Sequence, residues 1–303
     1  MHLPQWGPLA TRDGVLAVAR TIEECGLDSA WVADHVVYPL QGGERYPYSR
    51  KGPPFGPRDG FLEAFTTLAL VAGATSRIAL GTSAVVLPMR EPLLTAKTVA
   101  TLDVLSGGRT ILAIGAGWWA EEFRALGAPF EHRGRRVDEG IRVLRALWSQ
   151  GSLEHRGEFF RFAEIACEPR PVQPGGPPIW IAGTGPAAWR RTATLGDGWH
   201  PFQPRPEQLA EGRAQIDRIA REERRDPSEI GVSAAIGLPS DPGRAVERLL
   251  ELARRGVAHV VLAIPGASVE ERCAAIERFV SELRPVIRRE LAATSGQGAS
   301  FPG

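Results

Sequence analysis

An acidic side chain and an imidazole stand next to each other where a short apolar run ends, in the stretch DSAWVADHVVYP at positions 28–39. The acid is Asp34 and the imidazole is His35. A histidine with an unperturbed pKa of about 6.5 can give or take a proton near neutral pH. The pair therefore marks either the rim of an active site, with His35 as its catalytic residue, or a turn in which the histidine bonds a backbone carbonyl.

Glycines follow two further apolar runs. The stretch ILAIGAGW places Gly117 after one run, and IWIAGTGPAAW places Gly183 and Gly185 directly before Pro186. Proline is favoured in the first turn of a helix, and a helix that begins behind glycines offers free backbone N–H groups and the positive end of its dipole. The second turn is therefore a candidate phosphate site, with an ordinary tight turn as the alternative.

Tryptophans gather at the ends of the same apolar runs. They are Trp6, Trp118, Trp119 and Trp199, and His200 follows the last of them as a rival to His35. Large rings around an opening suit a flat aromatic ligand, although each could also pack beneath the rim. The loop at 37–60 holds all the tyrosines, Tyr38, Tyr46 and Tyr48, and a loop of that length predicts a lid that shapes the substrate pocket.

The elements that position these residues alternate between strand and helix. Eight short apolar runs, each followed by a helical pattern, predict a TIM (β/α)8 barrel as a single domain at 1–290, with active-site residues at the carboxyl ends of its strands. Two insertions interrupt it: the long loop at 37–60 after strand 2, and a hairpin with an extended stretch at 151–177 before strand 5. Residues 291–303 are small and polar and predict a disordered tail.

A doubly wound open sheet is the alternative fold, but the turn after HLPQW at 2–6 lacks the GxGxxG pattern of that fold. The run at 2–6 is short for a barrel strand. We therefore expect either a start upstream of Met1 or a weak seam between the first and last strands.

Charge and cysteine content exclude several classes. The formal net charge is +1, which gives no reason to expect a nucleic-acid partner or an anionic membrane surface. The three cysteines are dispersed, which predicts a reducing cytoplasm and no disulfide or zinc framework. Neither a signal peptide nor an apolar run of about 18 residues is apparent in the sequence.

With these residues placed, the chain resembles the luciferase-like monooxygenase superfamily. The resemblance is carried by WVADHVVYP, by RIALGTSAVVLPMREPLLTAKTVATLDVLSGGRTILAIGAGW and by GPPIWIAGTGPAAWRRTATLGDGWHP. More narrowly, it is similar to the branch that uses the deazaflavin coenzyme F420. This resemblance implies hydride transfer between F420 and a small organic substrate, with His35 as proton donor or acceptor, in a homodimer. The alternative is an FMN-dependent monooxygenase, with a flavin reductase as its partner.

The resemblance also implies the site residues. Asp34 would touch the deazaflavin head group, and a non-prolyl cis peptide at Ser83–Ala84 would back the ring. The phosphate and ribityl arm would lie along Ala116, Gly117, Ala182, Gly183, Thr184 and Gly185. The substrate pocket would be formed by Trp6, Tyr38, Trp118, Trp199 and His200.

One departure bears on the substrate. Sugar-phosphate dehydrogenases of this branch carry a glutamate directly after the strand-four glycine, where this sequence has Trp118; Glu121 and Glu122 follow. The departure argues for a more apolar substrate than a sugar phosphate. A metal-dependent barrel hydrolase built from His2, Asp34, His35 and His200 is a remote alternative, because the HxH of its first strand is missing.

Overall fold

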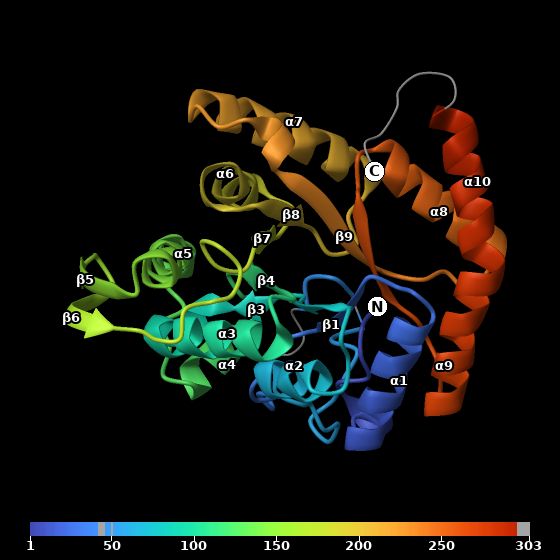
Figure 1. The fold of residues 1–303 in the computed structure, drawn as a ribbon, viewed down its shortest axis with the longest axis horizontal. Helices are drawn as coiled ribbons and strands as arrows, with labels where there is room; N and C mark the ends of the chain where they lie inside the picture. The colour runs from blue at the N-terminus through green and yellow to red at the C-terminus, as the bar shows by residue number, and fades with distance from the viewer. Residues whose placement is uncertain (42–45, 50, 296–303) are drawn as a thin grey trace.

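The computed structural model describes residues 1–41, 46–49 and 51–295. Parallel strands form one sheet in the order β1, β2, β4, β7, β8, β9, β10, with β3 paired to β4, and helices lie outside the strands (Figure 1). The strands are β1 Ser29–Val32, β2 Ala79–Thr82, β3 Val85–Val86, β4 Thr110–Gly115, β7 Ile179–Ala182, β8 Gly198–His200, β9 Gly231–Gly237 and β10 His259–Ala263. The helices are α1 Arg12–Glu24, α2 Ala64–Ala72, α3 Pro92–Ser106, α4 Ala120–Ala125, α5 Arg133–Gln150, α6 Pro186–Leu195, α7 Pro206–Glu222, α8 Pro242–Arg254, α9 Val269–Arg278 and α10 Arg284–Ser295.

The N-terminal segment closes this sheet into a barrel. The His2 N–H donates to the Leu262 carbonyl of β10 at 2.9 Å, and the Leu3 N–H donates to the Trp31 carbonyl of β1 at 2.9 Å. The strands follow one another around the barrel in chain order, without the reversal of a doubly wound sheet. The TIM-barrel prediction is confirmed. The first predicted strand is reduced to a bridge between His2 and Trp31.

The insertions take up predicted places. Strands β5 Ser152–Arg156 and β6 Arg161–Ala166 form an antiparallel hairpin that packs against α5 and projects from one end of the molecule (Figure 1).

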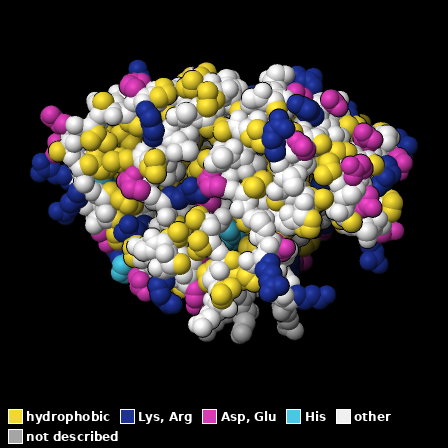
Figure 2. Space-filling model, turned by 90° about the horizontal axis from the view of Figure 1, so that it is seen from below, with side chains coloured by type: hydrophobic (Ala, Val, Ile, Leu, Met, Phe, Trp, Pro, Cys, Tyr) yellow, Lys and Arg dark blue, Asp and Glu magenta, His cyan; other side chains and the backbone are white. Residues whose placement is uncertain are grey.

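The tail prediction is wrong in part, because α10 continues to Ser295; residues 296–303 lie outside the described residues. In the part of the chain that the structure describes, no helix is long and apolar enough to cross a membrane. The face seen in Figure 2 carries acidic and basic side chains interspersed.

Aromatic rings fill the barrel interior. Trp31 is fully buried and stacks on Trp180 at 5.3 Å and on His200 at 5.2 Å between ring centroids. A Cβ at Gly81 would lie 2.3 Å from the Trp31 ring, so only glycine fits there. At the start of β10, His259 lies 3.0 Å from the Ser29 hydroxyl, at the opposite end of the strands from their carboxyl ends. Because the interior is packed, a site can lie only at the carboxyl ends of the strands.

Candidate active site at the mouth of the barrel

The carboxyl ends of β2, β4 and β7 meet around small side chains. The non-prolyl cis peptide between Ser83 and Ala84 is present, as the family resemblance implied. A Cβ built on Gly115 would lie 3.8 Å from the Ala84 Cβ and 3.9 Å from the Ala182 Cβ. All these residues are partly exposed. The three strand ends therefore form a shallow floor that a flat ring system can approach closely.

His35 is held at this mouth by an acid that the sequence analysis did not assign. Its Nδ1 atom lies 2.9 Å from Oε2 of Glu122, in the first turn of α4. The backbone N–H groups of Val36 and Val37 donate to Oε1 of the same carboxylate, at 2.8 and 3.3 Å. The Glu122 side chain is 2% exposed and that of His35 is 13% exposed. A carboxylate at Nδ1 holds the proton there, so Nε2 is the basic atom of the neutral ring. No hydrogen bond within the described part of the chain engages Nε2.

Asp34 lies in an ion pair with Arg90. Its carboxylate accepts from Arg90 through Nε at 3.1 Å and through a terminal nitrogen at 2.6 Å, and from the Val86 N–H at 2.9 Å. Arg90 also bonds Glu63, at 3.0 Å. The Asp34 side chain is 1% exposed. The carboxylate therefore ties the end of β1 to β3 and the turn after it, and its predicted contact with a cofactor ring stays a prediction.

The turn between β7 and α6 has the properties of an anion cradle. Gly183 has φ +121°, a conformation that side chains disfavour, and Gly185 caps α6 without a side-chain hydrogen bond. Within the described residues, no hydrogen bond engages the backbone N–H of Thr184, Gly185 or Ala187. A Cβ at Gly185 would meet nothing within 4 Å. Free N–H groups at a helix start and open space above them fit a phosphate group.

The turn after β4 lies beside a cation that the sequence analysis missed. Gly117 has φ +79°, and a Cβ there would lie 2.6 Å from both Phe123 and Val86, so glycine is required. Arg133, at the start of α5, donates from Nε to the Gly117 carbonyl at 3.2 Å and lies 3.9 Å above the Phe130 ring. Among the described residues it has no carboxylate partner. In the sequence, the run RGRR at 133–136 could have indicated this cation, because arginines at a helix start can face an anion.

Aromatic side chains from four segments surround His35. We call this group the ring cluster; it consists of Trp6, Tyr38, Tyr46, Phe55, Phe61, Trp118 and Trp119. The His35 ring lies 4.9 Å from Phe55 and 6.0 Å from Trp118, between centroids. Tyr46 of the loop predicted as a lid packs against Trp118 at 5.3 Å; residues 42–45 and 50 of this loop lie outside the described part.

Two predicted pocket residues lie elsewhere. Trp199 is fully buried on the outer side of the strands, where its Nε1 donates to the Gly183 carbonyl at 2.7 Å. A Cβ at Gly212 of α7 would lie 2.2 Å from the Trp199 ring, which shows how closely the ring packs against that helix. His200 points into the barrel, 2.8 Å from the Ser83 hydroxyl and 2.9 Å from that of Ser233. Neither side chain lines the mouth.

Burial also removes His200 as a rival to His35. Its side chain is enclosed in the barrel, and burial lowers its pKa to about 3, so it is neutral at physiological pH. The residues named for a metal-dependent hydrolase do not converge, since Asp34 faces Arg90, His200 faces two serines and His35 faces Glu122. Of these two histidines, His35 is the one that is partly exposed at the mouth.

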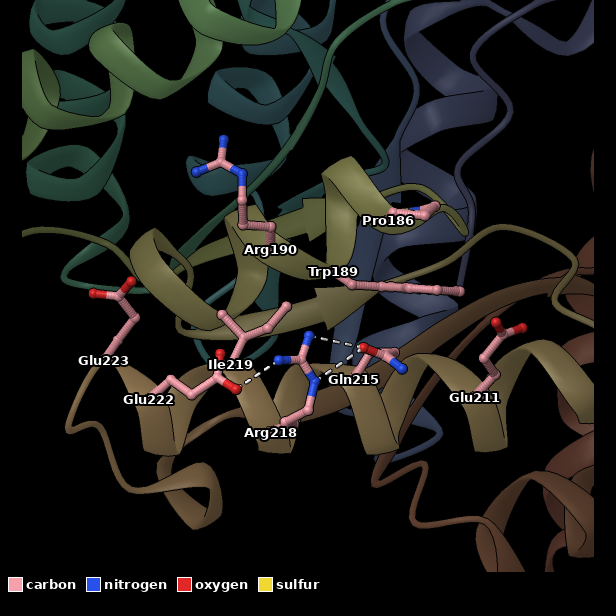
Figure 3. A pocket seen from close by; sticks show the side chains of 9 residues that line it. All are labelled: Pro186, Trp189, Arg190, Glu211, Gln215, Arg218, Ile219, Glu222 and Glu223. Atoms are coloured by element: carbon pink, nitrogen blue, oxygen red, sulfur yellow. Dashed lines mark hydrogen bonds and ion pairs between the residues drawn. The ribbon is translucent and has the colours of Figure 1, made fainter.

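A separate hollow of about 600 Å³ lies on the outer surface between α6 and α7 (Figure 3). Its lining carries charges of both signs, and Arg218 is already bonded to Glu222 at 2.6 Å and to Gln215 at 3.1 Å. Its lining residues include none of the ring cluster and none of the β2 or β4 ends. We assign the chemistry to the mouth, where His35, Glu122 and the glycine turns lie.

Comparison with known proteins agrees with the barrel fold. The model of the luciferase-like monooxygenase family matches residues 3–292. The uncharacterized protein Rv0940c of Mycobacterium tuberculosis is 32% identical over 249 residues, which cover 82% of this chain and 83% of that protein. The F420-dependent glucose-6-phosphate dehydrogenase of Amycolatopsis mediterranei is 32% identical over 199 residues, 64% of this chain and 54% of that enzyme.

A solved structure has a similar fold. It is an F420-dependent secondary alcohol dehydrogenase in complex with an F420–acetone adduct, with a TM-score of 0.77 and 20% sequence identity. The match covers 91% of this chain and 95% of that one. At this identity the likeness shows the fold alone.

Proposed function

The chain belongs to the luciferase-like monooxygenase family, and from this membership and the geometry of the mouth we propose that it is an F420-dependent oxidoreductase acting on a small organic molecule. The observation that carries the proposal is the His35–Glu122 pair, 2.9 Å apart, at the same mouth as the small-residue floor and the glycine turns. Relatives named as F420-dependent enzymes support the choice of cofactor.

The residues at the mouth fit a deazaflavin with a phosphorylated arm. The ring would lie on the floor formed by Ser83, Ala84 and Ala182. The phosphate would bind the free N–H groups at Thr184 and Gly185. The rest of the arm would lie along Ala116, Gly117 and Gly183. When bound, the deazaflavin accepts or returns a hydride, and the protein supplies binding, orientation and a proton path.

His35 supplies the proton path. Glu122 fixes its Nδ1 proton, which leaves Nε2 to accept a proton from a substrate hydroxyl or, once protonated, to return it to a carbonyl oxygen. Glu122 is a positioning residue in this scheme, since its own oxygens are occupied by His35 and by the backbone of Val36 and Val37. Trp118 and other rings of the cluster surround this imidazole with aromatic surface.

Titration of the purified protein with F420 and with FMN tests the choice of cofactor. Trp6 and Trp118 lie at the mouth, so their fluorescence reports occupancy. We expect F420 to quench it and FMN to bind far more weakly. FMN binding without F420 binding would instead support the monooxygenase alternative, in which a flavin reductase supplies reduced FMN.

We further propose that the protein is a homodimer. Leu94 and Leu105 of α3 are 67% and 64% exposed, and Leu70 of the neighbouring α2 is 38% exposed. A helix pair that shows apolar side chains outward gains stability when a second copy covers it. We expect sedimentation equilibrium to give a dimer, and the double substitution Leu94→Glu, Leu105→Glu to give a folded monomer.

A further inference from the structure

The ring cluster encloses His35 from several directions. Phe61 lies edge-on to the His35 ring at 5.6 Å, Trp119 edge-on at 5.9 Å, and Phe55 tilted at 4.9 Å. Trp6 stacks on Phe61 at 5.6 Å with 10° between the planes. A ligand that brings an oxygen to His35 Nε2 must therefore place its body among aromatic faces and edges. Such surroundings favour an apolar body, above all one with a ring of its own.

Among the described residues, no arginine or lysine lies over a ring of the cluster, and the acid in contact with His35 is Glu122. The cations that lie over aromatic rings are elsewhere: Arg90 over Phe65, Arg133 over Phe130, and Arg135 and Arg136 over the rings of the hairpin. Arg90 is committed to two carboxylates. Burial raises the pKa of Tyr46 to about 12, so its hydroxyl stays neutral.

Among the residues that the structure describes, an anionic substrate group would find no cation over these rings. Taking a phosphate or carboxylate out of water without a cation or several hydrogen bonds is strongly unfavourable. The one acid near His35, Glu122, would repel an anion further, and its charge is directed at the imidazole. The anion-binding features of the mouth lie instead at Gly185, which the proposed function gives to the cofactor arm, and at Arg133, which bonds the Gly117 carbonyl on the path of that arm.

We propose that the ring cluster is the substrate subsite and that it selects an uncharged alcohol or ketone with an apolar, ring-sized body, whose oxygen meets His35 Nε2. Sugar phosphates are excluded, in contrast to the dehydrogenase relative named for glucose 6-phosphate. This assignment rests on the proposed function for its chemistry, whereas the binding preference rests on the ring cluster alone.

The test uses acetophenone and 1-phenylethanol as apolar probes and glucose 6-phosphate as the anionic one. Binding is measured by tryptophan fluorescence and by thermal shift, with and without F420, and F420 reduction is followed separately. We expect both apolar probes to bind the free protein and glucose 6-phosphate not to bind. Phe61→Ala and Trp118→Ala should each weaken acetophenone binding about tenfold, as loss of an aromatic contact predicts. Phe159→Ala, in the hairpin, is the matched control and should not.

The outcomes separate this inference from the proposed function. If F420 binds and is reduced only with glucose 6-phosphate, the function stands and the substrate class is overturned. If F420 does not bind but acetophenone binds in a Trp118-dependent way, the subsite stands and the cofactor proposal fails. Acetophenone binding that is insensitive to both ring substitutions would place the apolar site outside the ring cluster and overturn the inference.

Discussion

The Nδ1 atom of His35 lies 2.9 Å from Oε2 of Glu122, a residue 87 positions later in the chain. The bond joins the turn after β1 to the first turn of α4, and it decides which imidazole nitrogen faces the mouth. A buried carboxylate whose other oxygen accepts two backbone N–H groups cannot turn away to another partner. The pair therefore sets both the tautomer and the orientation of the proposed proton carrier.

The first prediction concerns this pair. His35→Ala should lower turnover by about 10²–10⁴, the usual scale for a lost general acid or base, and leave F420 affinity within a few fold. Glu122→Gln should also lower turnover, by about 10²–10⁴, because an amide N–H facing Nδ1 favours the wrong tautomer. Steady-state kinetics checks both, with Glu121→Gln as the matched control. Full activity in Glu122→Gln would remove the acid from the mechanism.

The second prediction concerns the anion cradle at the start of α6. Gly185→Ala should weaken F420 binding about tenfold or more without changing the melting temperature, because its Cβ enters open space above the free N–H groups. Gly183→Val is a poor probe, since φ is +121° and a Cβ would lie 2.9 Å from Ala188; it should destabilise the fold.

Gly231→Ala is the control for the two substitutions at Gly185 and Gly183. A Cβ at Gly231 also meets nothing within 4 Å, but this residue lies at the start of β9, at the opposite end of the strands. Titration with F420 and thermal melting measure both quantities. Unchanged affinity in Gly185→Ala would move the phosphate away from α6.

The third prediction separates structure from cofactor contact at Asp34. Asp34→Ala removes the acceptor of the Val86 N–H and one of the two carboxylates that pair with Arg90, leaving Glu63. Breaking a buried ion pair from one side costs about 3–5 kcal/mol. We expect urea unfolding to show a loss of this size. Loss of F420 affinity with stability unchanged would support the cofactor contact predicted from the sequence.

The strand ends were predictable from the sequence, because parallel strands bring their carboxyl ends to one edge. His35 and the glycine turns were expected at one mouth for this reason, whereas the Ser83–Ala84 cis peptide was expected only from the family resemblance. The sequence could not show which way Trp199 points. A strand buried on both faces is apolar throughout, so neighbouring residues such as Trp199 and His200 give no sign of which faces the helices and which the barrel interior.

The partners of Asp34 and His35 could also not be predicted from the sequence. Arg90 and Glu122 follow Asp34 and His35 at separations set by turns, where no periodic pattern links a residue to its contact. The direction of α4 brings Glu122, and not Glu121, to His35. Only the folded structure shows that Asp34 pairs with Arg90 and that Glu122 pairs with His35.

The last prediction is that the free energy of unfolding decreases at mildly acid pH because of two histidines inside the barrel. Burial lowers the pKa of His200 to about 3 and that of His259 to about 4, below the value of about 6.5 expected in the unfolded chain. The unfolded state therefore takes up protons first as the pH falls. Stability from these groups is complete above pH of about 6.5 and declines toward pH 4, by up to about 1.4 kcal/mol per pH unit for each histidine.

Urea unfolding between pH 5 and pH 7 measures this slope above the range in which most carboxylates titrate. His259→Gln should reduce the slope by one histidine's share, because an amide can keep a hydrogen bond to Ser29 without titrating. His132 is exposed and has φ 58°, which asparagine tolerates, so His132→Asn should leave the slope unchanged. A slope that is equal in the wild type and in His259→Gln would mean that this imidazole is protonated in the folded barrel, and that its bond to Ser29 is made as a cation.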